Sequence, residues 1–536
     1  MADGQDLRDI PSGAKAVRMT EVPNEPTTII RPDDKRYPAL SRGFNQRWIA
    51  EPDYVRLVRN SEEVREALAD AVGEGLDDGV LQDQGRITVR SGGHCYENFV
   101  CGHDVRVILD ISPMCGVSYD EAMDAYCVEA GATNWHAYSH LYPLSGRALP
   151  GGSCYSVGLG GHITGGGFGL LSRQHGLTVD YLYAVEVAVV REDRTVELVI
   201  AKRDDLDPDR AELLWAHTGG GGGNFGVVTR FWFRDLPEPP RQVLLTGLAW
   251  DWPDFTKEDF AALVTGFGEY FRDHQDPGTA AGKLFAMLKL NHVSNGQIGL
   301  LAQVDADDED GPEAMRDFLV AVDDRIGPRS RAMTTAMGEH PTVVHMDIPR
   351  VMPWLTATQA LNGSGENRCG KYKSAYLRKP FTSEQIDAMW ACLGKERFTD
   401  YKNKQALIQI DSYGAAINRP PRDTAVRQRD SILKMQYQVY WTRNDSYEPD
   451  HLEWIRETYR ATFDQTHGVP VIGDGTDGCY ISYPDVDLND PRWNESDQAW
   501  STLYYKDAYP RLRRIKRRWD PLDVFRHRQS IRLPES

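Results

Sequence analysis

The feature that most restricts the fold of this chain is a glycine-dense stretch between residues 90 and 169. It opens with Arg90-Ser91-Gly92-Gly93-His94 and passes through Pro150-Gly151-Gly152-Ser153-Cys154 into a run of glycines that ends at Gly169. Glycine costs backbone entropy inside a helix or strand, so this stretch cannot be mostly regular structure. Main-chain N–H groups without side chains form concave sites that suit phosphate. The pattern favours a phosphate-bearing cofactor such as a dinucleotide, with a loop-rich surface region as the alternative.

Two residues of these loops carry a specific resemblance. His94 in the Arg-Ser-Gly-Gly-His loop and Cys154 in the Pro-Gly-Gly-x-Cys loop resemble the double flavin attachment of berberine-bridge-enzyme-like flavoprotein oxidases, which belong to the p-cresol methylhydroxylase/vanillyl-alcohol oxidase superfamily. The similarity covers residues 42–534. Within the family, the chain looks most like the bacterial oxidases that modify glycosylated antibiotics, the aclacinomycin oxidoreductase and glycopeptide hexose oxidase types. The resemblance implies covalent FAD, joined to His94 at its 8α carbon and to Cys154 at C6.

The resemblance also implies which further residues bind the cofactor. They come from the two loops, from a second glycine-rich segment at residues 215–228, and from the C-terminal region. Besides His94 and Cys154, the implied cofactor-binding residues are Arg90, Ser91, Gly92, Gly93, Cys95, Gly151, Gly152, Gly158, Gly161, Thr164, Gly165, Asn224, Gly226, Val228 and Tyr505.

The second glycine-rich segment also satisfies a different motif. Residues 221–226 match G-x-G-x-x-G, which in a Rossmann fold follows a strand and opens a helix. Residues 227–233 instead have the pattern of a strand, so we reject a Rossmann interpretation.

Oxidation of an alcohol needs a base within hydrogen-bond reach of the hydroxyl. In the resembled oxidases the base is a tyrosine, whose pKa of about 10 must be lowered by its surroundings. Tyr483 matches that tyrosine, and Tyr413 matches a second tyrosine that assists it. If the segment around Tyr483 is a strand, Tyr480 and Tyr483 point to opposite faces, and only one of them faces the flavin.

Three positions depart from the family pattern. Phe168 stands where the nearest family types carry a tyrosine, and phenylalanine cannot exchange a proton. In the aclacinomycin enzyme that tyrosine serves a second oxidation, so Phe168 predicts a single oxidation or a different substrate class. Ser482 and Ala508 each stand where relatives usually carry asparagine.

The resemblance thus implies an FAD-dependent oxidase that converts an alcohol to a carbonyl and reduces O2 to H2O2. The alcohol would be a sugar or glycoside hydroxyl of a specialised metabolite, as in antibiotic biosynthesis. Two alternatives stay open. One is a flavin-dependent dehydrogenase or oxidative cyclase of natural-product biosynthesis, and the other is a non-catalytic protein that retains the flavin fold.

Composition limits the partners and the compartment. The net charge of −18 argues against a nucleic-acid partner, which requires a basic surface. No apolar run reaches the roughly 18 residues of a membrane span, and residues 1–35 contain no apolar core of a secretory signal. We therefore expect a cytoplasmic protein with mostly reduced cysteines. No metal is expected, because the spacing of Cys95, Cys101 and His103 matches no standard zinc site.

The length of 536 residues predicts more than one domain. We expect a flexible N-terminal arm at 1–41, an FAD-binding domain at 42–240, a substrate-binding domain at 241–490, and a return to the FAD-binding domain at 491–536. The expected fold class is α+β: an FAD-binding domain of p-cresol methylhydroxylase type, plus an antiparallel substrate-domain sheet covered by helices.

The predicted elements follow from periodicity, caps and turns. In the first part, strands are expected at 55–58, 87–89, 105–110, 126–130, 183–190, 195–200 and 227–233, and helices at 135–142 and from Ser61, which would cap its own helix. Residues 73–84 are expected to form a surface loop. In the second part, strands are expected at 283–290, 297–304, 407–410 and 435–441, and helices from Thr256 and Pro312 and at 383–393 and 452–463. Residues 513–518 are expected to form a solvated basic helix.

Overall fold

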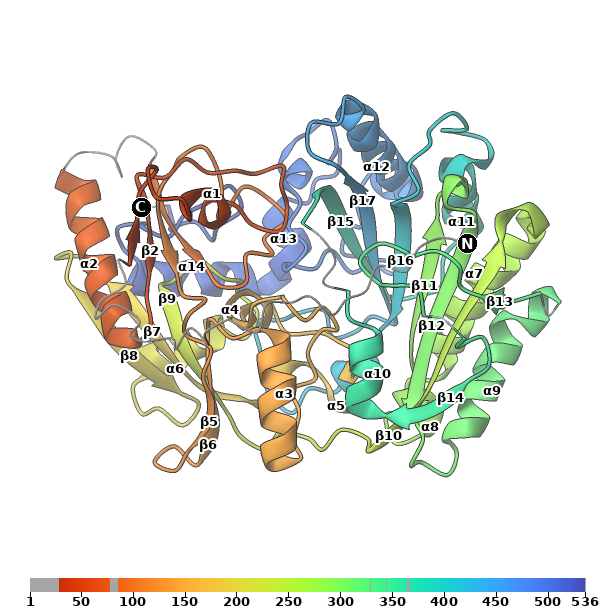
Figure 1. Ribbon diagram of the computed structural model, residues 1–536, viewed down its shortest axis with the longest axis horizontal. Coiled ribbons are helices and arrows are strands. Elements are labelled where there is room, and N and C mark those ends of the chain that lie inside the picture. The colour runs from red at the N-terminus through yellow and green to blue at the C-terminus, as the bar shows by residue number, and fades with distance from the viewer. Residues whose placement is uncertain (1–27, 78–84, 328, 344, 364–366, 536) are drawn as a thin grey trace, which may run out of the picture.

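The computed structural model describes residues 28–77, 85–327, 329–343, 345–363 and 367–535. Two parts lie side by side in Figure 1. The first part, on the left, holds a four-stranded and a five-stranded sheet, and the second holds an eight-stranded sheet within these residues. The predicted α+β class, with an antiparallel substrate-domain sheet covered by helices, is confirmed.

The first sheet is mostly parallel. Its order is β1-β2-β4-β3, with β2, β4 and β3 parallel and β1 antiparallel to β2. The elements of this region are β1 (Ile29–Ile30), α1 (Tyr37–Leu40), β2 (Tyr54–Leu57), α2 (Ser61–Asp77), β3 (Arg86–Arg90) and β4 (Val105–Asp110). The carboxyl end of β3 therefore delivers the Arg90–His94 loop, as the sequence predicts.

The second sheet is antiparallel, in the order β5-β6-β9-β7-β8. All nine residues of β7 are buried, and one of them is the acidic residue Glu186. Glu186 accepts from Arg230, from Thr229 and from the Ser61 hydroxyl. The elements are β5 (Val117–Asp120), β6 (Ala125–Glu129), α3 (Asn134–Ser145), α4 (Leu159–Thr164), α5 (Ser172–His175), β7 (Leu182–Val190), β8 (Val196–Lys202), α6 (Pro208–Ala216) and β9 (Val227–Phe233).

The large sheet begins at β10, directly after Pro239-Pro240. It runs β13-β10-β12-β11-β16-β17-β15, with β14 also paired to β10, and every pair is antiparallel. Its strands are β10 (Gln242–Asp251), β11 (Phe285–Asn291), β12 (Gln297–Asp305), β13 (Arg331–Ala332), β14 (Arg350–Pro353), β15 (Cys369–Leu377), β16 (Ala406–Ser412) and β17 (Leu433–Trp441).

Amphipathic helices cover one face of this sheet. In α7 the side chain of Thr256 caps the first turn and eight residues of the helix are buried. The helices α7, α9, α11 and α12 lie on the side of the sheet away from the first part of the chain (Figure 1). The helices of the second part are α7 (Lys257–Asp273), α8 (Ala280–Lys283), α9 (Gly311–Val322), α10 (Trp354–Ala360), α11 (Ser383–Trp390) and α12 (Glu448–Thr462).

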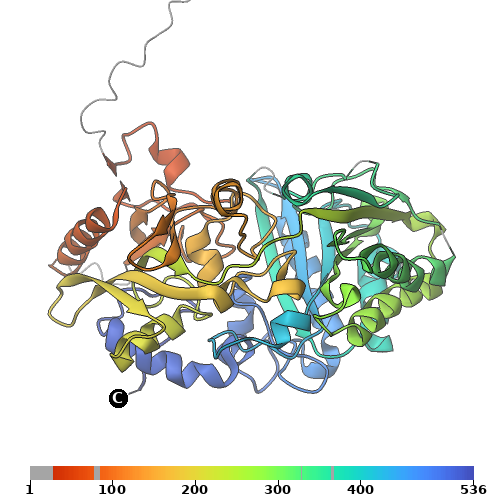
Figure 2. The ribbon, with the colours of Figure 1, turned by 90° about the horizontal axis from the view of Figure 1, so that it is seen from below.

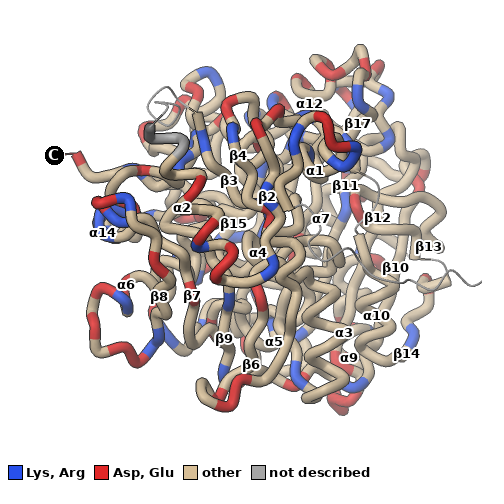
Figure 3. Tube along the Cα trace, turned by 60° about the vertical axis from the view of Figure 1, so that its left-hand side comes forward, with Lys and Arg blue, Asp and Glu red and all other residues tan. Residues whose placement is uncertain are grey.

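The C-terminal segment returns to the first part through α13 (Trp500–Tyr505) and α14 (Tyr509–Trp519). Figure 2 shows the molecule from below, and in this view α14 runs along the lower edge of the first part of the chain. Lys and Arg residues gather at α14 in Figure 3. Two of them pair with acidic residues of α6, Arg511 with Glu212 and Arg518 with Asp209 at 2.6 Å. The expected solvated helix is solvated only in part, because Lys516 is buried against Asp520.

Several local predictions differ from the structure. Residues 28–41, which we placed in the arm, include β1 and α1, while residues 1–27 lie outside the described residues. Helix α2 continues to Asp77, so the loop expected from residue 73 is shorter, and its residues 78–84 are not described. Ser61 bonds Glu186 instead of capping its helix, and the Asn60 side chain accepts from the Glu63 N–H at 2.9 Å. Lys283 ends α8 and does not begin a strand.

A buried group of ions joins the two parts. On the edge strand β15, Lys371 Nζ donates to Glu97 and to Asp485, each at 2.6 Å. Lys373 lies 2.7 Å from Asp485, and both lysines are within 3.5 Å of Asp487. Burial alone lowers the pKa of Lys371, but the nearby Asp485 and Asp487 raise it above its ordinary value. Glu97 follows the Arg90–His94 loop and Asp485 follows Tyr483, so these ions link both loops to the large sheet.

No helix in the described ranges is long and apolar enough to span a bilayer.

We expect Lys371→Met to lower the free energy of unfolding by about 3–5 kcal/mol, because it leaves buried carboxylates without their cation. The matched control is Lys257→Met, which removes a surface pair that is 41% and 56% exposed and should change stability by about 0–1 kcal/mol. Chemical denaturation of both variants measures the difference. Equal stability of the two variants would contradict the assignment of Lys371 as the central cation.

Candidate active site

One extended cavity lies between the glycine loops of the first part and the open face of the large sheet. Sixteen of the nineteen predicted site residues line it. The exceptions are Gly151, Gly165 and Tyr413. The predicted residues that line the cavity are Arg90, Ser91, Gly92, Gly93, His94, Cys95, Gly152, Cys154, Gly158, Gly161, Thr164, Asn224, Gly226, Val228, Tyr483 and Tyr505.

The glycines of these loops do two different things. A Cβ on Gly92 would come within 2.3 Å of the Gly158 nitrogen, and a Cβ on Gly158 within 2.1 Å of the Gly92 nitrogen. These two glycines let the two loops touch. A Cβ on Gly165 would meet Ser482 Oγ at 2.0 Å, so Gly165 serves the approach of the Tyr483 segment and not the ligand. Gly161 and Gly223 instead face open space, with no atom within 4 Å of an added Cβ.

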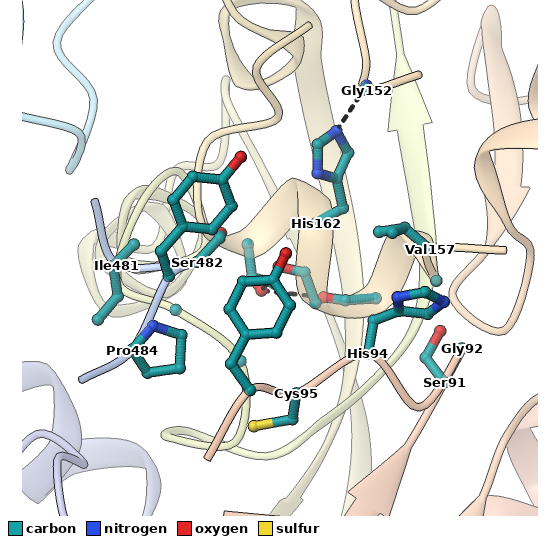
Figure 4. Close-up of a pocket in the computed structure, with 18 of the residues that line it drawn as sticks. Ser91, Gly92, His94, Cys95, Gly152, Val157, His162, Ile481, Ser482 and Pro484 are labelled. Atoms are coloured by element: carbon teal, nitrogen blue, oxygen red, sulfur yellow. Dashed lines mark hydrogen bonds between the residues drawn. The ribbon is translucent and has the colours of Figure 1, made fainter. Parts of the chain in front are cut away.

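The loop contact brings His94 and the Cys154 loop together. His94 Nε2 lies 2.8 Å from the hydroxyl of Ser156, and its ring stacks on Phe44 at a centroid distance of 4.6 Å. Burial lowers the pKa of His94 to about 4, so its imidazole is neutral at pH 7 and can act as a nucleophile. Figure 4 shows His94 and Gly152 on one side of the cavity and Ser482 and Pro484 across from them.

The Cys154 loop is also oriented by a histidine that the sequence analysis missed. The N–H of Gly152 donates to His162 Nε2 at 3.1 Å (Figure 4). Burial lowers the pKa of His162 to about 4, which keeps this nitrogen available as an acceptor. The Asn134 amide donates to the Cys154 carbonyl at 2.9 Å, so two side chains fix the loop.

The residues present fit the FAD that the resemblance implies. Gly161 and Gly223 leave space for a ligand to approach the main chain, and main-chain N–H groups of this kind bind phosphate. Asn134 lines the cavity, and its buried Oδ1 accepts no hydrogen bond from the described residues. Beyond the glycines, the cavity continues to Phe99 and His527, whose rings stack at 4.1 Å. This length suits a dinucleotide.

The side chains of three predicted cofactor-binding residues form hydrogen bonds with other residues of the protein. The Arg90 guanidinium pairs with the buried Asp110 and donates to the carbonyls of Leu40 and Arg42. The Asn224 side chain accepts from the Ile531 N–H at 2.8 Å and donates to the Gly220 carbonyl at 3.0 Å. The Tyr505 hydroxyl donates to the same carbonyl at 3.1 Å. In this structure these side chains shape the cavity wall.

Tyr483 lies in an irregular segment and not in a strand. Its N–H donates to the Tyr480 carbonyl at 2.9 Å, which closes a turn. The two rings consequently lie 4.9 Å apart and both line the cavity. We expected Tyr480 and Tyr483 to point to opposite faces only if their segment is a strand. That expectation does not apply, because side chains alternate only along an extended strand.

The hydroxyl of Tyr483 lies 3.2 Å from Lys434 Nζ, which is paired with Asp411 at 2.9 Å. Burial raises the pKa of Tyr483 well above its ordinary value, and Asp411 raises it further. The Lys434 ammonium acts in the opposite direction because it stabilises the tyrosinate. Tyr483 is therefore the cavity tyrosine with a cation at its hydroxyl.

Tyr413 is not placed as expected. It is fully buried, and its hydroxyl donates to the Gln428 carbonyl at 2.9 Å. Phe168 lines the cavity in front of it, with ring centroids 5.4 Å apart. Lys434 Nζ also lies 4.5 Å from the centre of the Phe168 ring. The structure thus places Lys434 at the Tyr483 hydroxyl, where the sequence analysis expected Tyr413.

The opposite wall of the cavity is polar. The sheet face that the helices leave open presents Gln409 and Asp411 from β16 and Gln436 and Gln438 from β17. The segment before β14 adds Glu339, whose pKa burial raises to about 7. The sequence analysis missed this wall. Its signal is the alternation of polar residues with apolar ones in two strands that are otherwise apolar.

Comparison with known proteins agrees with this geometry. A model of an FAD-binding domain matches residues 52–198, and a model described as berberine and berberine-like matches residues 479–532. Aclacinomycin-N/aclacinomycin-A oxidase of Streptomyces galilaeus is 40% identical over 95% of this chain and 90% of its own length. The chain belongs to the berberine-bridge-enzyme-like family of FAD-binding oxidases.

Other members of this family extend the likeness. Hexose oxidase of Chondrus crispus is 37% identical over 93% of each chain. The crystal structure of a glycopeptide hexose oxidase complexed with teicoplanin superposes with a TM-score of 0.84 at 37% identity, over 94% of this chain and 98% of that one. A flavoenzyme of caerulomycin biosynthesis superposes with a TM-score of 0.85 at 41% identity, over 94% of this chain and 99% of that one.

Membership of the family makes this protein an FAD-dependent oxidoreductase and removes the non-catalytic alternative. Among the described residues, no three His, Cys, Asp or Glu side chains are grouped to hold a metal ion. None of the eight cysteines, all of them within the described ranges, is in a disulfide.

We expect Gly161→Val to fold normally but to bind less FAD, because the new side chain projects into open cavity space. The control is Gly473→Val, where an added Cβ also meets nothing within 4 Å but the residue is not among those lining the cavity. Flavin per protein, from visible absorbance, and the thermal midpoint are measured for both. Full flavin loading of Gly161→Val would show that Gly161 does not face the cofactor.

Proposed function

We propose that the protein is an oxidase that converts a sugar or glycoside hydroxyl to a carbonyl and reduces O2 to H2O2. The observation that carries the proposal is the Tyr483 hydroxyl, 3.2 Å from Lys434 Nζ, inside a cavity between glycine loops and a polar wall. Removal of an alcohol proton requires a base within hydrogen-bond reach, and a neighbouring cation lowers the pKa of a tyrosine that serves as that base.

In this proposal Tyr483 accepts the proton of the substrate hydroxyl as its phenolate. Lys434 lowers the cost of that phenolate in a buried site, and Asp411 holds Lys434 in place. FAD held by the glycine loops would supply the redox chemistry, acceptance of a hydride from the carbon that carries the hydroxyl group and reoxidation by O2. The chain's own residues supply the orientation of the reacting groups.

We also propose that FAD is attached twice, through its 8α carbon to His94 and through C6 to Cys154. The neutral imidazole of His94 and the contact between its loop and the Cys154 loop support this. Two bonds would hold the isoalloxazine ring while the substrate side of the cavity stays open. The other predicted cofactor-binding residues would contact FAD from the loops that line the cavity.

The polar wall supports a substrate that carries several hydroxyl groups. Carboxamides both donate and accept hydrogen bonds, as hydroxyl groups do, and Gln409, Gln436 and Gln438 all line the cavity. Relatives named for hexose oxidation and for aclacinomycins, and the teicoplanin complex, point to the same substrate class. We propose a single oxidation step, because Phe168 offers no proton-exchanging group beside Lys434.

We expect Tyr483→Phe to slow flavin reduction by the substrate by about 10²–10⁴-fold, the usual contribution of a positioned base. The visible spectrum of the bound flavin should not change. Tyr413→Phe is the matched control, since that hydroxyl donates to the Gln428 carbonyl and should affect the rate far less. Stopped-flow reduction compares the two, with sugars and glycosides screened by peroxide release.

A near-normal reduction rate in Tyr483→Phe would remove Tyr483 as the base. Peroxide release alone does not separate this oxidase from an oxidative cyclase, so the product structure is determined as well. A ketone, aldehyde or lactone with no new ring-forming C–C bond supports the proposal.

We expect peptides containing His94 and Cys154 to carry the flavin mass after proteolysis of freshly isolated protein. His94→Ala should keep a single bond through Cys154, and Cys154→Ala a single bond through His94. Mass spectrometry of the peptides and the yellow colour of acid-precipitated protein measure this. Two unmodified peptides would refute covalent attachment.

A further inference from the structure

Lys289 on β11 is a buried lysine whose hydrogen bonds all go to uncharged acceptors. Its Nζ donates to the Met337 carbonyl at 3.1 Å, to His340 Nδ1 at 3.0 Å and to Gln409 Oε1 at 2.8 Å. These acceptors use all three of its donors, and all are uncharged groups. Among the described residues, no Asp or Glu oxygen lies close enough to form an ion pair with it. A buried charge without a counter-ion is costly, so Lys289 needs a functional reason.

The first link from Lys289 sets the orientation of an amide. Gln409 Oε1 accepts from Lys289, and Gln409 Nε2 donates to Asp411 Oδ1 at 2.7 Å. Rotating this amide by half a turn would set its NH2 against an ammonium and its oxygen against a carboxylate. The two charges therefore select one orientation.

The next links lead to the base. Asp411 Oδ2 accepts from Lys434 Nζ at 2.9 Å, and Lys434 Nζ lies 3.2 Å from the Tyr483 hydroxyl. Strand register builds this path: Lys289 is opposite Gln409, and Asp411 is opposite Lys434. Gln409 and Asp411 are two residues apart and so share one face of β16.

The other side of Lys289 reaches the Cys154 loop. Because His340 Nδ1 accepts from Lys289, its Nε2 carries the hydrogen, and it lies 3.3 Å from the Ser153 hydroxyl. Burial, with Lys289 adding to it, holds the pKa of His340 well below its ordinary value, so the ring stays neutral. One ammonium thus reaches Ser153, the residue before Cys154, through His340 and also begins the path to Tyr483.

We propose that Lys289 is a positioning residue for Tyr483, acting through Gln409, Asp411 and Lys434. This rests on the proposed function, in which Tyr483 is the base. The chain of hydrogen bonds prevents Asp411 and Lys434 from turning away from the hydroxyl. The charge of Lys289 also partly offsets Asp411, which otherwise favours the protonated phenol.

The ionisable groups around this path determine whether the loss of Lys289 raises or lowers the pKa of Tyr483. Burial lowers the pKa of Lys289 to about 8, while Asp411 and Glu339 raise it, so it is largely protonated at neutral pH. Loss of Lys289 removes a positive charge and leaves the carboxylates, so the Tyr483 pKa rises. The groups that face Tyr483 are Lys434 and Asp411 from the sheet, Tyr480 from its own segment, Tyr96 from the loop after β3, and Glu339 and Cys154 from neighbouring loops.

We expect Lys289→Met to lower kcat/KM by about tenfold or more below about pH 8, where Lys289 is charged and favours the active phenolate of Tyr483. Above that pH the wild-type lysine is itself neutral, so the difference from Lys289→Met should shrink. Lys289→Arg keeps the charge and should lose less activity than Lys289→Met at low pH. Lys283→Met removes a pair with Asp308 that does not line the cavity, and its pH profile should match that of the wild type.

A second measurement is independent of turnover. Tyrosine labelled with 13C at Cζ is titrated by NMR in the FAD-loaded protein, and the Tyr483 signal is the one absent from Tyr483→Phe. In the wild type this signal should move as Lys289 loses its proton near pH 8, and in Lys289→Met that movement should be absent. Flavin content and thermal midpoint establish that each variant is folded and loaded.

Wild-type activity at low pH in folded Lys289→Met would overturn the inference, as would an equal loss of activity at every pH, or a Tyr483 signal that still moves near pH 8. If that variant does not fold, Gln409→Leu breaks the next link, and the movement of the Tyr483 signal must be lost from it as well. The proposed function fails separately, if Tyr483→Phe reduces its flavin at the normal rate. A pH-dependent loss in Lys289→Met with full activity loss in Tyr483→Phe supports both.

Discussion

The contact on which the site depends is the buried group of ions around Lys371. It binds Glu97, three residues beyond His94, and Asp485, two residues beyond Tyr483, at 2.6 Å each. With Lys373 and Arg456 against Asp487, the positive and negative charges balance. Such a group adds less net stability than apolar packing, but it is very costly to break. We infer that its value lies in alignment, because it holds the His94 loop, the Tyr483 segment and the edge strand of the large sheet against one another.

On the cofactor side of the cavity, glycines bring the loops together. Gly92 and Gly158 allow two loops to approach more closely than any Cβ permits, and Gly165 does the same for the Tyr483 segment. The side chains of Arg90, Asn224 and Tyr505 are used to hold these loops. The wall that faces the cofactor is therefore mainly backbone, which explains why so few charged side chains line the cavity.

The two faces of the large sheet have different roles, one in stability and the other in chemistry. Apolar side chains such as Ile408, Ile410 and Met435 alternate with Gln409, Asp411 and Lys434 along the same strands. The apolar face is covered by helices, and the polar face lines the cavity. Low polarisability around buried charges strengthens their interaction. A phenolate can be stabilised there by a single ammonium, provided that the partners of that ammonium hold it still.

The sequence by itself determined the loops and most strands and helices, because glycine spacing, periodicity and caps are local properties of the chain. The family, and Tyr483 as the base candidate, came from the resemblance of its motifs to a known family. The sequence also indicated correctly that residues 227–233 form a strand and not a Rossmann helix. It could not assign the partners of these residues. That Lys434, and not Tyr413, lies at the Tyr483 hydroxyl, and that Lys289 begins a path to it, depends on strand register and on which sheet face stays open. Only the tertiary structure decides these contacts, because they join residues from strands and loops far apart in the chain.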